Sequence, residues 1–223
     1  MKLLALETSG PALSLALKVD DQVVSIHHLM PQQQTHFILP EIDQLLKSNN
    51  VKLNHLDAIA FGCGPGSFTG IRIAASVAQG LAFPFQIPLI PISSLKILAA
   101  TAYQERQWSK VLIAVDARMQ EVYWAQYEMK QGVPVLLGSE SVIKPKAIAF
   151  PATDEWYAVG DGWGIYSQEM NFNPLARDVK LLPNAAALIS LAEVCFKEGE
   201  TLSCLEAFPH YIRNNAWQPQ SSS

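Results

Sequence analysis

A glycine-rich segment at residues 62–70 (Gly-Cys-Gly-Pro-Gly-Ser-Phe-Thr-Gly) has the residue types best suited to ligand chemistry. An apolar run with strand character precedes it, and a proline-free apolar run that can hold a helix to Phe83 follows it. Glycines in a strand-to-helix turn let backbone N–H groups approach an anion. The segment fits neither the P-loop nor the dinucleotide fingerprint. It therefore predicts either a phosphate-binding turn that uses Gly64, Gly66 and Ser67, or a tight turn without a ligand.

Two carboxylates, Glu7 and Asp116, each follow the first strand of a pattern that occurs twice in the chain. Each half opens with a strand, an acid, a second strand, a hairpin signal and a third strand. The expected strands are 3–6, 12–19 and 23–29 in the first half, and 111–115, 121–127 and 133–142 in the second. Helical patterns follow at 35–47, 68–83 and 93–106, and then at 146–150 and 184–197.

This duplication indicates an α/β fold of the actin-like ATPase (ribonuclease H-like) type, with a shortened second lobe. We expect lobes at 1–107 and 108–217 and a disordered tail at 218–223. In that architecture the two acids face each other across a cleft that holds metal and phosphates. Glu7 and Asp116 thus join the glycine turn as candidate nucleotide-site residues. The alternative is that both acids cap local N–H groups in turns.

Composition limits the classes of partner. The 223 residues carry a net charge of −4 and no basic run, which argues against a stand-alone nucleic-acid binder. No apolar stretch is long enough to span a membrane, and the N-terminus has no signal-peptide pattern. Three scattered cysteines do not suggest a disulfide framework. These features favour a cytoplasmic protein.

The sequence offers no catalytic or metal-binding motif. No two of the five histidines are three or four residues apart, and no Gly-x-Ser-x-Gly or nucleophilic cysteine signature occurs. We therefore expect neither a catalytic residue nor a metal site. The glycine-rich run 160–164 predicts a turn, with an adenosine-side loop of the second lobe as the alternative.

The helix expected at 68–83 is apolar on nearly all sides, so it should be covered on nearly all sides. Gly70, Ala74, Ala78 and Ala82 recur every four residues and form a smooth ridge against which another helix can lie. The 35–47 helix is the nearest candidate neighbour. The ridge is either the core of one lobe or an intermolecular surface.

Four blocks of this chain resemble the TsaB family. They are Leu6–Ser9, Gly62–Arg72, Val115–Ala125 and Tyr211–Asn215. The resemblance extends from Met1 to about Trp217, and its most specific parts are 64–70 and 116–123. One departure is Glu7, where the family mostly has aspartate.

The resemblance implies a non-catalytic accessory subunit of the bacterial machinery that makes threonylcarbamoyladenosine at position 37 of tRNA. It implies TsaD, the catalytic paralogue of the same fold with a His-x-x-x-His metal site, as a partner, and the ATPase TsaE as another. Contact with tRNA would occur only through the complex. The lone chain would need no cofactor, whereas ATP or ADP at the complex interface is left open.

The resemblance also favours the intermolecular reading of the ridge, as a helical bundle with TsaD or with a second copy when TsaD is absent. The expected interface residues are Ile38, Ile42, Gly70, Ile71, Ala74, Ala78 and Ala82. Arg118 and Arg213 lie in family blocks and are either interface or surface charges. Two other function classes stay open: an independent small-molecule kinase or ATPase of this fold, and a glycoprotease-like peptidase.

Overall fold

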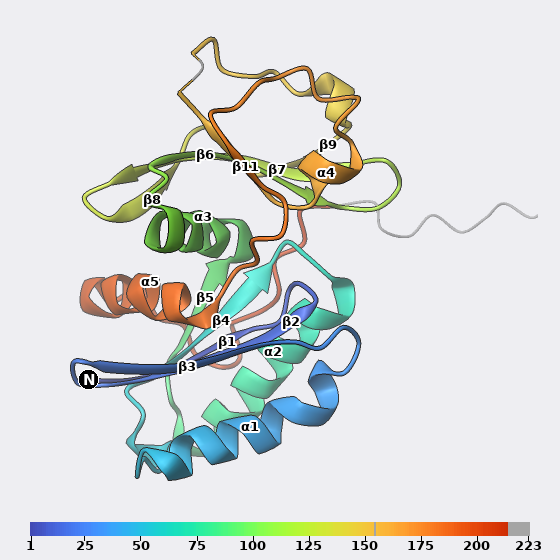
Figure 1. Cartoon of the computed structure of the whole chain (residues 1–223). Helices are drawn as coiled ribbons and strands as arrows, with labels where there is room; N and C mark the ends of the chain where they lie inside the picture. Colours follow the sequence, from blue (N-terminus) through green and yellow to red (C-terminus); the bar gives the residue numbers. More distant parts are fainter. Residues whose placement is uncertain (154, 214–223) are drawn as a thin grey trace, which may run out of the picture.

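The computed structural model describes residues 1–153 and 155–213, which build two sheets with helices packed on them (Figure 1). The first sheet has the strand order β3-β2-β1-β4-β5. Strands β1 to β3 form an antiparallel meander, whereas β4 and β5 run parallel to β1. The strands are β1 Lys2–Glu7, β2 Ala12–Val19, β3 Gln22–Leu29, β4 Ala58–Gly64 and β5 Leu89–Ser93.

The second sheet repeats this topology in the order β11-β10-β6-β7-β8. Strands β6, β7 and β8 take the places of β1, β2 and β3, and β10 and β11 take those of β4 and β5. The predicted duplication is therefore confirmed. The strand expected at 133–142 is split at Gly138, whose φ of 86° is left-handed. The strands are β6 Lys110–Asp116, β7 Val122–Lys130, β8 Val133–Leu136, β9 Ser141–Ile143, β10 Tyr157–Val159 and β11 Arg177–Asp178.

Helices form the remaining layers, as Figure 1 shows. Helices α1 (Gln34–Ser48) and α2 (Phe68–Ala82) cover the outer face of the first sheet. Helices α3 (Ser94–Arg106) and α5 (Ala185–Glu198) lie between the two sheets. The one-turn helix α4 (Gly162–Ile165) and 3-10 turns at Leu53–His55, Phe83–Phe85 and Pro145–Ala147 complete the described elements.

The helices begin where the sequence offers a capping side chain. Ser67 accepts a hydrogen bond from the Gly70 N–H at 3.3 Å and starts α2. Ser93 and Asn184 cap α3 and α5 in the same way. Each oxygen satisfies a backbone donor that has no partner within its helix. Local chemistry alone therefore sets these three boundaries.

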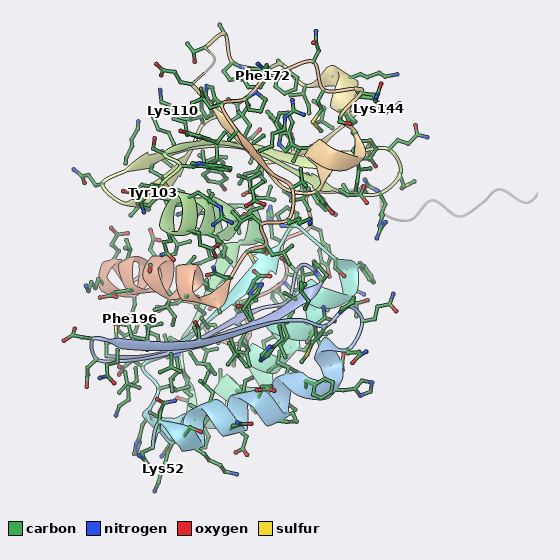
Figure 2. The ribbon with its side chains drawn as sticks, viewed as in Figure 1. Lys52, Tyr103, Lys110, Lys144, Phe172 and Phe196 are labelled. Atoms are coloured by element: carbon green, nitrogen blue, oxygen red, sulfur yellow. The ribbon has the colours of Figure 1, made fainter. Side chains whose placement is uncertain are left out.

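Each of the two middle helices has residues that pack on the sheet of the opposite lobe. On α3, Leu95 and Leu98 pack on the second sheet, against Val111 among others. On α5, Leu188 and Leu191 pack on the first sheet. Side chains fill the layer between the sheets, where Tyr103 and Phe196 mark the two helices in Figure 2. The boundary expected at residue 107 therefore separates the two sheets but does not describe the packing of α3 and α5.

The small-residue ridge of α2 faces the interior of the first lobe. Every residue expected to form the intermolecular interface is buried within the chain itself: Ile38, Ile42, Gly70, Ile71, Ala74, Ala78 and Ala82. The α1 residues and the three alanines belong to one core cluster together with Phe61 of β4. We therefore correct the intermolecular reading. The short side chains of the ridge let α2 lie close to its own sheet and to α1.

This packing makes Ala78 a sensitive position. Its side chain is fully buried, so Ala78→Arg places an unpaired charge in the core, at a cost of several kcal/mol. Total stability is about 5–15 kcal/mol, so we expect the variant to unfold or to melt far below the parent chain. Ser76→Arg is the matched control, because Ser76 is exposed on the same helix. Equal melting of the two variants by circular dichroism would contradict the core assignment.

Candidate functional site

A cleft of about 890 Å³ lies where the two lobes meet. Its walls come from the β1–β2 turn, the glycine turn before α2, the end of β6 and residues 210–213. Of the predicted site residues, the cleft is lined by Gly66, Ser67 and Asp116. Glu7 and Gly64 lie outside the lining, so the structure brings together only part of the predicted set.

Glu7 is sealed beneath the cleft. Its side chain is 1% exposed. One carboxylate oxygen accepts a hydrogen bond from the Ser9 N–H at 2.5 Å, and the other accepts one from the Ser94 hydroxyl at 3.3 Å. Burial raises the pKa of Glu7 above its ordinary value of 4.5, although these hydrogen bonds oppose the shift. The carboxylate is thus bound to the chain itself.

The glycine turn packs against the β1–β2 turn. The Ser67 N–H donates to the Ser9 carbonyl at 2.7 Å. A Cβ on Gly66 would lie 2.7 Å from the Ser9 carbonyl oxygen, and one on Gly70 would collide with the Thr8 carbonyl. These glycines therefore permit contact between two backbone segments. The Ser67 N–H, which could have bound a phosphate, already has a partner.

Asp116 is held by its own lobe. One carboxylate oxygen accepts hydrogen bonds from the Arg118 N–H at 3.0 Å and from the Tyr166 hydroxyl at 2.9 Å. The other forms an ion pair with the Arg118 guanidinium at 3.3 Å. The Asp161 carboxylate accepts from the Asp116 N–H at 2.9 Å. This geometry matches the turn-capping alternative, and it leaves Asp116 at the cleft wall rather than facing Glu7 as an exposed pair.

Of the run 160–164, where a turn was expected, only Gly160 and Asp161 form a turn, and residues 162–164 belong to α4. Gly160 has a φ of 106° and lies against the carbonyl of Ala114 in β6. Trp163 is buried and donates its indole N–H to the Leu112 carbonyl at 3.0 Å. The glycines let this turn sit tightly on the second sheet.

Sequence reasoning missed several residues of the site. Ser94 and Tyr166 donate hydrogen bonds to the two acids, and each comes from a segment far from its acid in the chain. Asp161 lies in the run 160–164 noted in the sequence, but its role as acceptor for the Asp116 N–H was not expected. The helix expected at 93–106 does begin at the Ser93-Ser94 pair, but nothing in the sequence places this pair beside Glu7. Tyr166 has no sequence signal of its own.

Two observations on the described residues concern a cysteine nucleophile and a metal site. Burial raises the pKa of the Cys63 thiol to about 12, with further contributions from the Glu140 and Glu7 carboxylates. A thiol with this pKa is a poor source of thiolate. Across residues 1–153 and 155–213, no cluster of three or more histidine, cysteine, aspartate or glutamate side chains is placed to hold a metal ion. No helix in the same part of the chain is long and apolar enough to cross a membrane.

The buried carboxyl predicts a pH-dependent stability. Because folding raises the pKa of Glu7, the penalty for burying its charge is absent well below the unfolded value of 4.5, where the group is protonated in both states, and it grows as pH rises toward the folded value. We expect Glu7→Gln, which preserves size, to melt above the parent chain at pH 7. That advantage should shrink toward pH 4.

Glu193→Gln provides a control of opposite sign. The pKa of Glu193 is lowered, chiefly by its hydrogen bond from Lys197, so its stabilising contribution is present at neutral pH and is lost in acid. This variant should melt below the parent at pH 7. A Glu7→Gln variant whose melting temperature runs parallel to that of the parent from pH 4 to 7 would refute the assignment.

Known proteins match nearly the whole chain. A family model described as TsaD, tRNA N6-adenosine threonylcarbamoyltransferase, matches residues 29–218. The tRNA threonylcarbamoyladenosine biosynthesis protein TsaB of Haemophilus influenzae is 42% identical, over 96% of this chain and 94% of its own. The Escherichia coli protein of the same name is 38% identical, over 98% and 97%.

Solved structures agree with these matches. A Pseudomonas aeruginosa crystal structure, described as an uncharacterized protein with similarity to peptidase YEAZ, superposes with a TM-score of 0.91 at 44% identity. It covers 95% of this chain and 99% of its own. The two-lobed actin-like fold is thus confirmed, and the chain belongs to the TsaB family.

Proposed function

We propose that this chain is a non-catalytic subunit in tRNA threonylcarbamoyladenosine biosynthesis and that it acts by binding the catalytic paralogue TsaD. The names of its relatives support the pathway. The observation that carries the non-catalytic role is the state of the cleft. The groups that would hold metal and phosphate there, Glu7, Asp116 and the Ser67 N–H, are bonded to other groups of the chain instead.

An independent kinase or ATPase is the second candidate, and the same geometry weighs against it. A nucleotide site needs accessible acids and free backbone donors. Glu7 is buried under the β1–β2 turn, and the Ser67 N–H is bound to Ser9. Binding in the cleft would require these turns to separate. For the peptidase alternative, the Cys63 thiol is a poor nucleophile, because it is buried and burial raises its pKa.

The outer face of α2 supports a docking role. Thr69, Arg72, Ser76 and Gly80 are exposed along one stripe, opposite the buried alanine ridge. A Cβ added to Gly80 would meet nothing within 4 Å. A large exposed aromatic residue lies at each end of the stripe: Phe68 is 56% exposed and Phe83 is 65% exposed. Short residues between exposed aromatics suit the close approach of a partner helix.

TsaD is the partner that fits this face best. The chain matches the TsaD family model over most of its length, so we expect TsaD to have helices equivalent to α1 and α2. Two such pairs can pack as a pseudo-symmetric bundle, in which each outer face covers the other. The intermolecular contact thus uses the exposed side of α2 rather than the ridge expected from the sequence.

Further parts of the expected assembly stay predictions. They are the ATPase TsaE as a second partner, contact with tRNA only through the complex, a homodimer when TsaD is absent, ATP or ADP at the complex interface, and a cytoplasmic location. The lone chain is proposed to need no cofactor.

A charge on the exposed stripe tests the docking face. Ser76→Arg should leave a folded chain, because Ser76 faces outward. It should weaken TsaD binding by about 100-fold, which corresponds to about 2.7 kcal/mol. Isothermal titration calorimetry with purified TsaD measures the change.

Two variants complete that experiment. Gly80→Arg should have a similar effect from the same stripe, whereas Gln168→Arg is the matched control because it places the same charge on exposed surface of the second lobe, away from α1 and α2. Undiminished TsaD binding by both folded stripe variants would refute this docking face.

Catalysis by the lone chain is a separate test. We expect no transfer of the threonylcarbamoyl group from its activated adenylate to tRNA when TsaD is omitted. The candidate groups of the cleft are bonded within the chain, and the sequence has a net charge of −4 and no basic run that could bind RNA. Modified nucleoside is quantified by mass spectrometry after digestion. Product formed by the purified chain alone would overturn the accessory role, whatever the result of the binding test.

A further inference from the structure

The C-terminal part of the described chain, residues 202–213, forms a strap over the first lobe. Leu202 and Leu89 exchange two backbone hydrogen bonds of 2.8 Å. The Gln79 side chain of α2 donates to the carbonyls of Cys204 and Ala207 at 3.2 and 3.0 Å. The Ala207 side chain is fully buried in the first core. The strap is therefore fastened to the first lobe along its length.

Two further anchors bring the strap to the cleft. The His210 N–H donates to the Cys63 carbonyl at 2.7 Å. The Tyr211 hydroxyl accepts from the Arg72 guanidinium at 2.8 Å, and that guanidinium lies 3.4 Å from the Phe68 ring centroid. Residues 210–213 all line the cleft. In Figure 1 the strap is the red trace that runs from the first lobe toward the second.

The strap ends on the other lobe. The Arg213 guanidinium donates to the Ala117 carbonyl at 3.1 Å and to the Glu121 carboxylate at 2.6 Å. It also lies 2.9 Å from the sulfur of Met119. One side chain of the strap therefore contacts three residues of the loop between β6 and β7, across the cleft from its own anchors.

That loop has a strained backbone. Arg118, Met119 and Gln120 have φ values of 62°, 55° and 60°. Three consecutive left-handed residues without a glycine are uncommon, and each is less stable than in an ordinary conformation. Met119 is 79% exposed, so packing of its side chain does little to hold the loop. The contacts from Arg213 supply support from outside the loop.

The Arg213 contact is also incomplete. Its Nε–H is buried and has no acceptor among the described residues. A buried donor without a partner has lost its hydrogen bond to water without a replacement. Movement of the guanidinium out of the loop would return that donor to solvent, which offsets part of the cost of losing the other contacts.

We propose that Arg213 is a latch between the two lobes. In the latched state the strap holds the 117–121 loop in its strained form and keeps the cleft closed. When the guanidinium leaves, the loop relaxes and the lobes separate at the cleft. Helices α3 and α5, together with the contacts of Glu140 to Ser93 and Tyr127, remain as the connection about which the lobes move.

Amide hydrogen exchange measured by mass spectrometry tests the local part. In Arg213→Ala we expect exchange in residues 117–121 to accelerate by about tenfold or more, with no change in β1 or β4. Arg106→Ala is the matched control: it removes an arginine–carboxylate pair, to Asp178 at 3.0 Å, that does not involve the strap. This control should leave exchange at 117–121 unchanged.

Distances between two spin labels, measured by double electron–electron resonance, test whether the lobes separate. Spin labels at exposed positions, Gln32→Cys on the first lobe and Gln168→Cys on the second, report the opening in a background with Cys195 and Cys204 replaced by serine. We expect a longer and broader distance distribution in Arg213→Ala than in the parent.

Conservative variants keep the proposal testable if the alanine variant is unstable. Glu121→Gln removes the charge but preserves size, and Arg213→Lys keeps the charge but loses the planar fork. Both should give intermediate exchange at 117–121. The latch is overturned if folded variants exchange within twofold of the parent in this loop, or if the loop loosens while the distance between the lobes stays unchanged.

Discussion

The close approach of the β1–β2 turn to the glycine turn is the contact on which the rest of this structure depends. Gly66 and Gly70 lie against the backbone of Thr8 and Ser9, where a Cβ would collide. The contact covers Glu7 and orients the first turn of α2. It also uses a backbone donor, the Ser67 N–H, that a nucleotide phosphate would otherwise need. The same contact between two turns therefore stabilises the lobe and uses a backbone donor that could have bound a ligand.

Because the two sheets have the same topology, the surroundings of Glu7 and Asp116 can be compared directly, and they differ. Glu7 and Asp116 stand at equivalent strand ends, but one is buried without a cationic partner and the other is paired with Arg118 at the cleft wall. Neither acid is free. A metal–nucleotide site needs accessible carboxylates, so these contacts weigh against ATPase chemistry in this cleft.

The proposed docking face and the proposed latch lie on neighbouring parts of the described chain. The outer stripe of α2 is exposed, contains short residues and has an exposed aromatic residue at each end, which suits a partner helix. The strap lies beside this stripe, because Arg72 on the stripe bonds Tyr211, and two residues later Arg213 reaches the second lobe. The docking face and the latch are therefore physically adjacent.

Local signals in the sequence were sufficient for most of the elements. Alternating and continuous apolar runs predicted the meanders, and Ser67, Ser93 and Asn184 cap α2, α3 and α5 as capping chemistry requires. Strand β5 was not expected, because Pro88 and Pro91 obscure its pattern. Pro91 is tolerated within it because β5 is an edge strand of the sheet. The structure of the tail expected at 218–223 lies outside the described residues.

Tertiary structure alone decided the site and the direction of the α2 ridge. A glycine turn reads the same in sequence whether it holds a phosphate or another backbone, and the distinction depends on Ser9, more than fifty positions away. A helix that is apolar nearly all round does not reveal which side meets its own sheet. The sequence by itself determined the duplicated fold and the family, because these follow from local patterns repeated in order. Which groups meet in the cleft depends on long-range packing, and no local pattern encodes it.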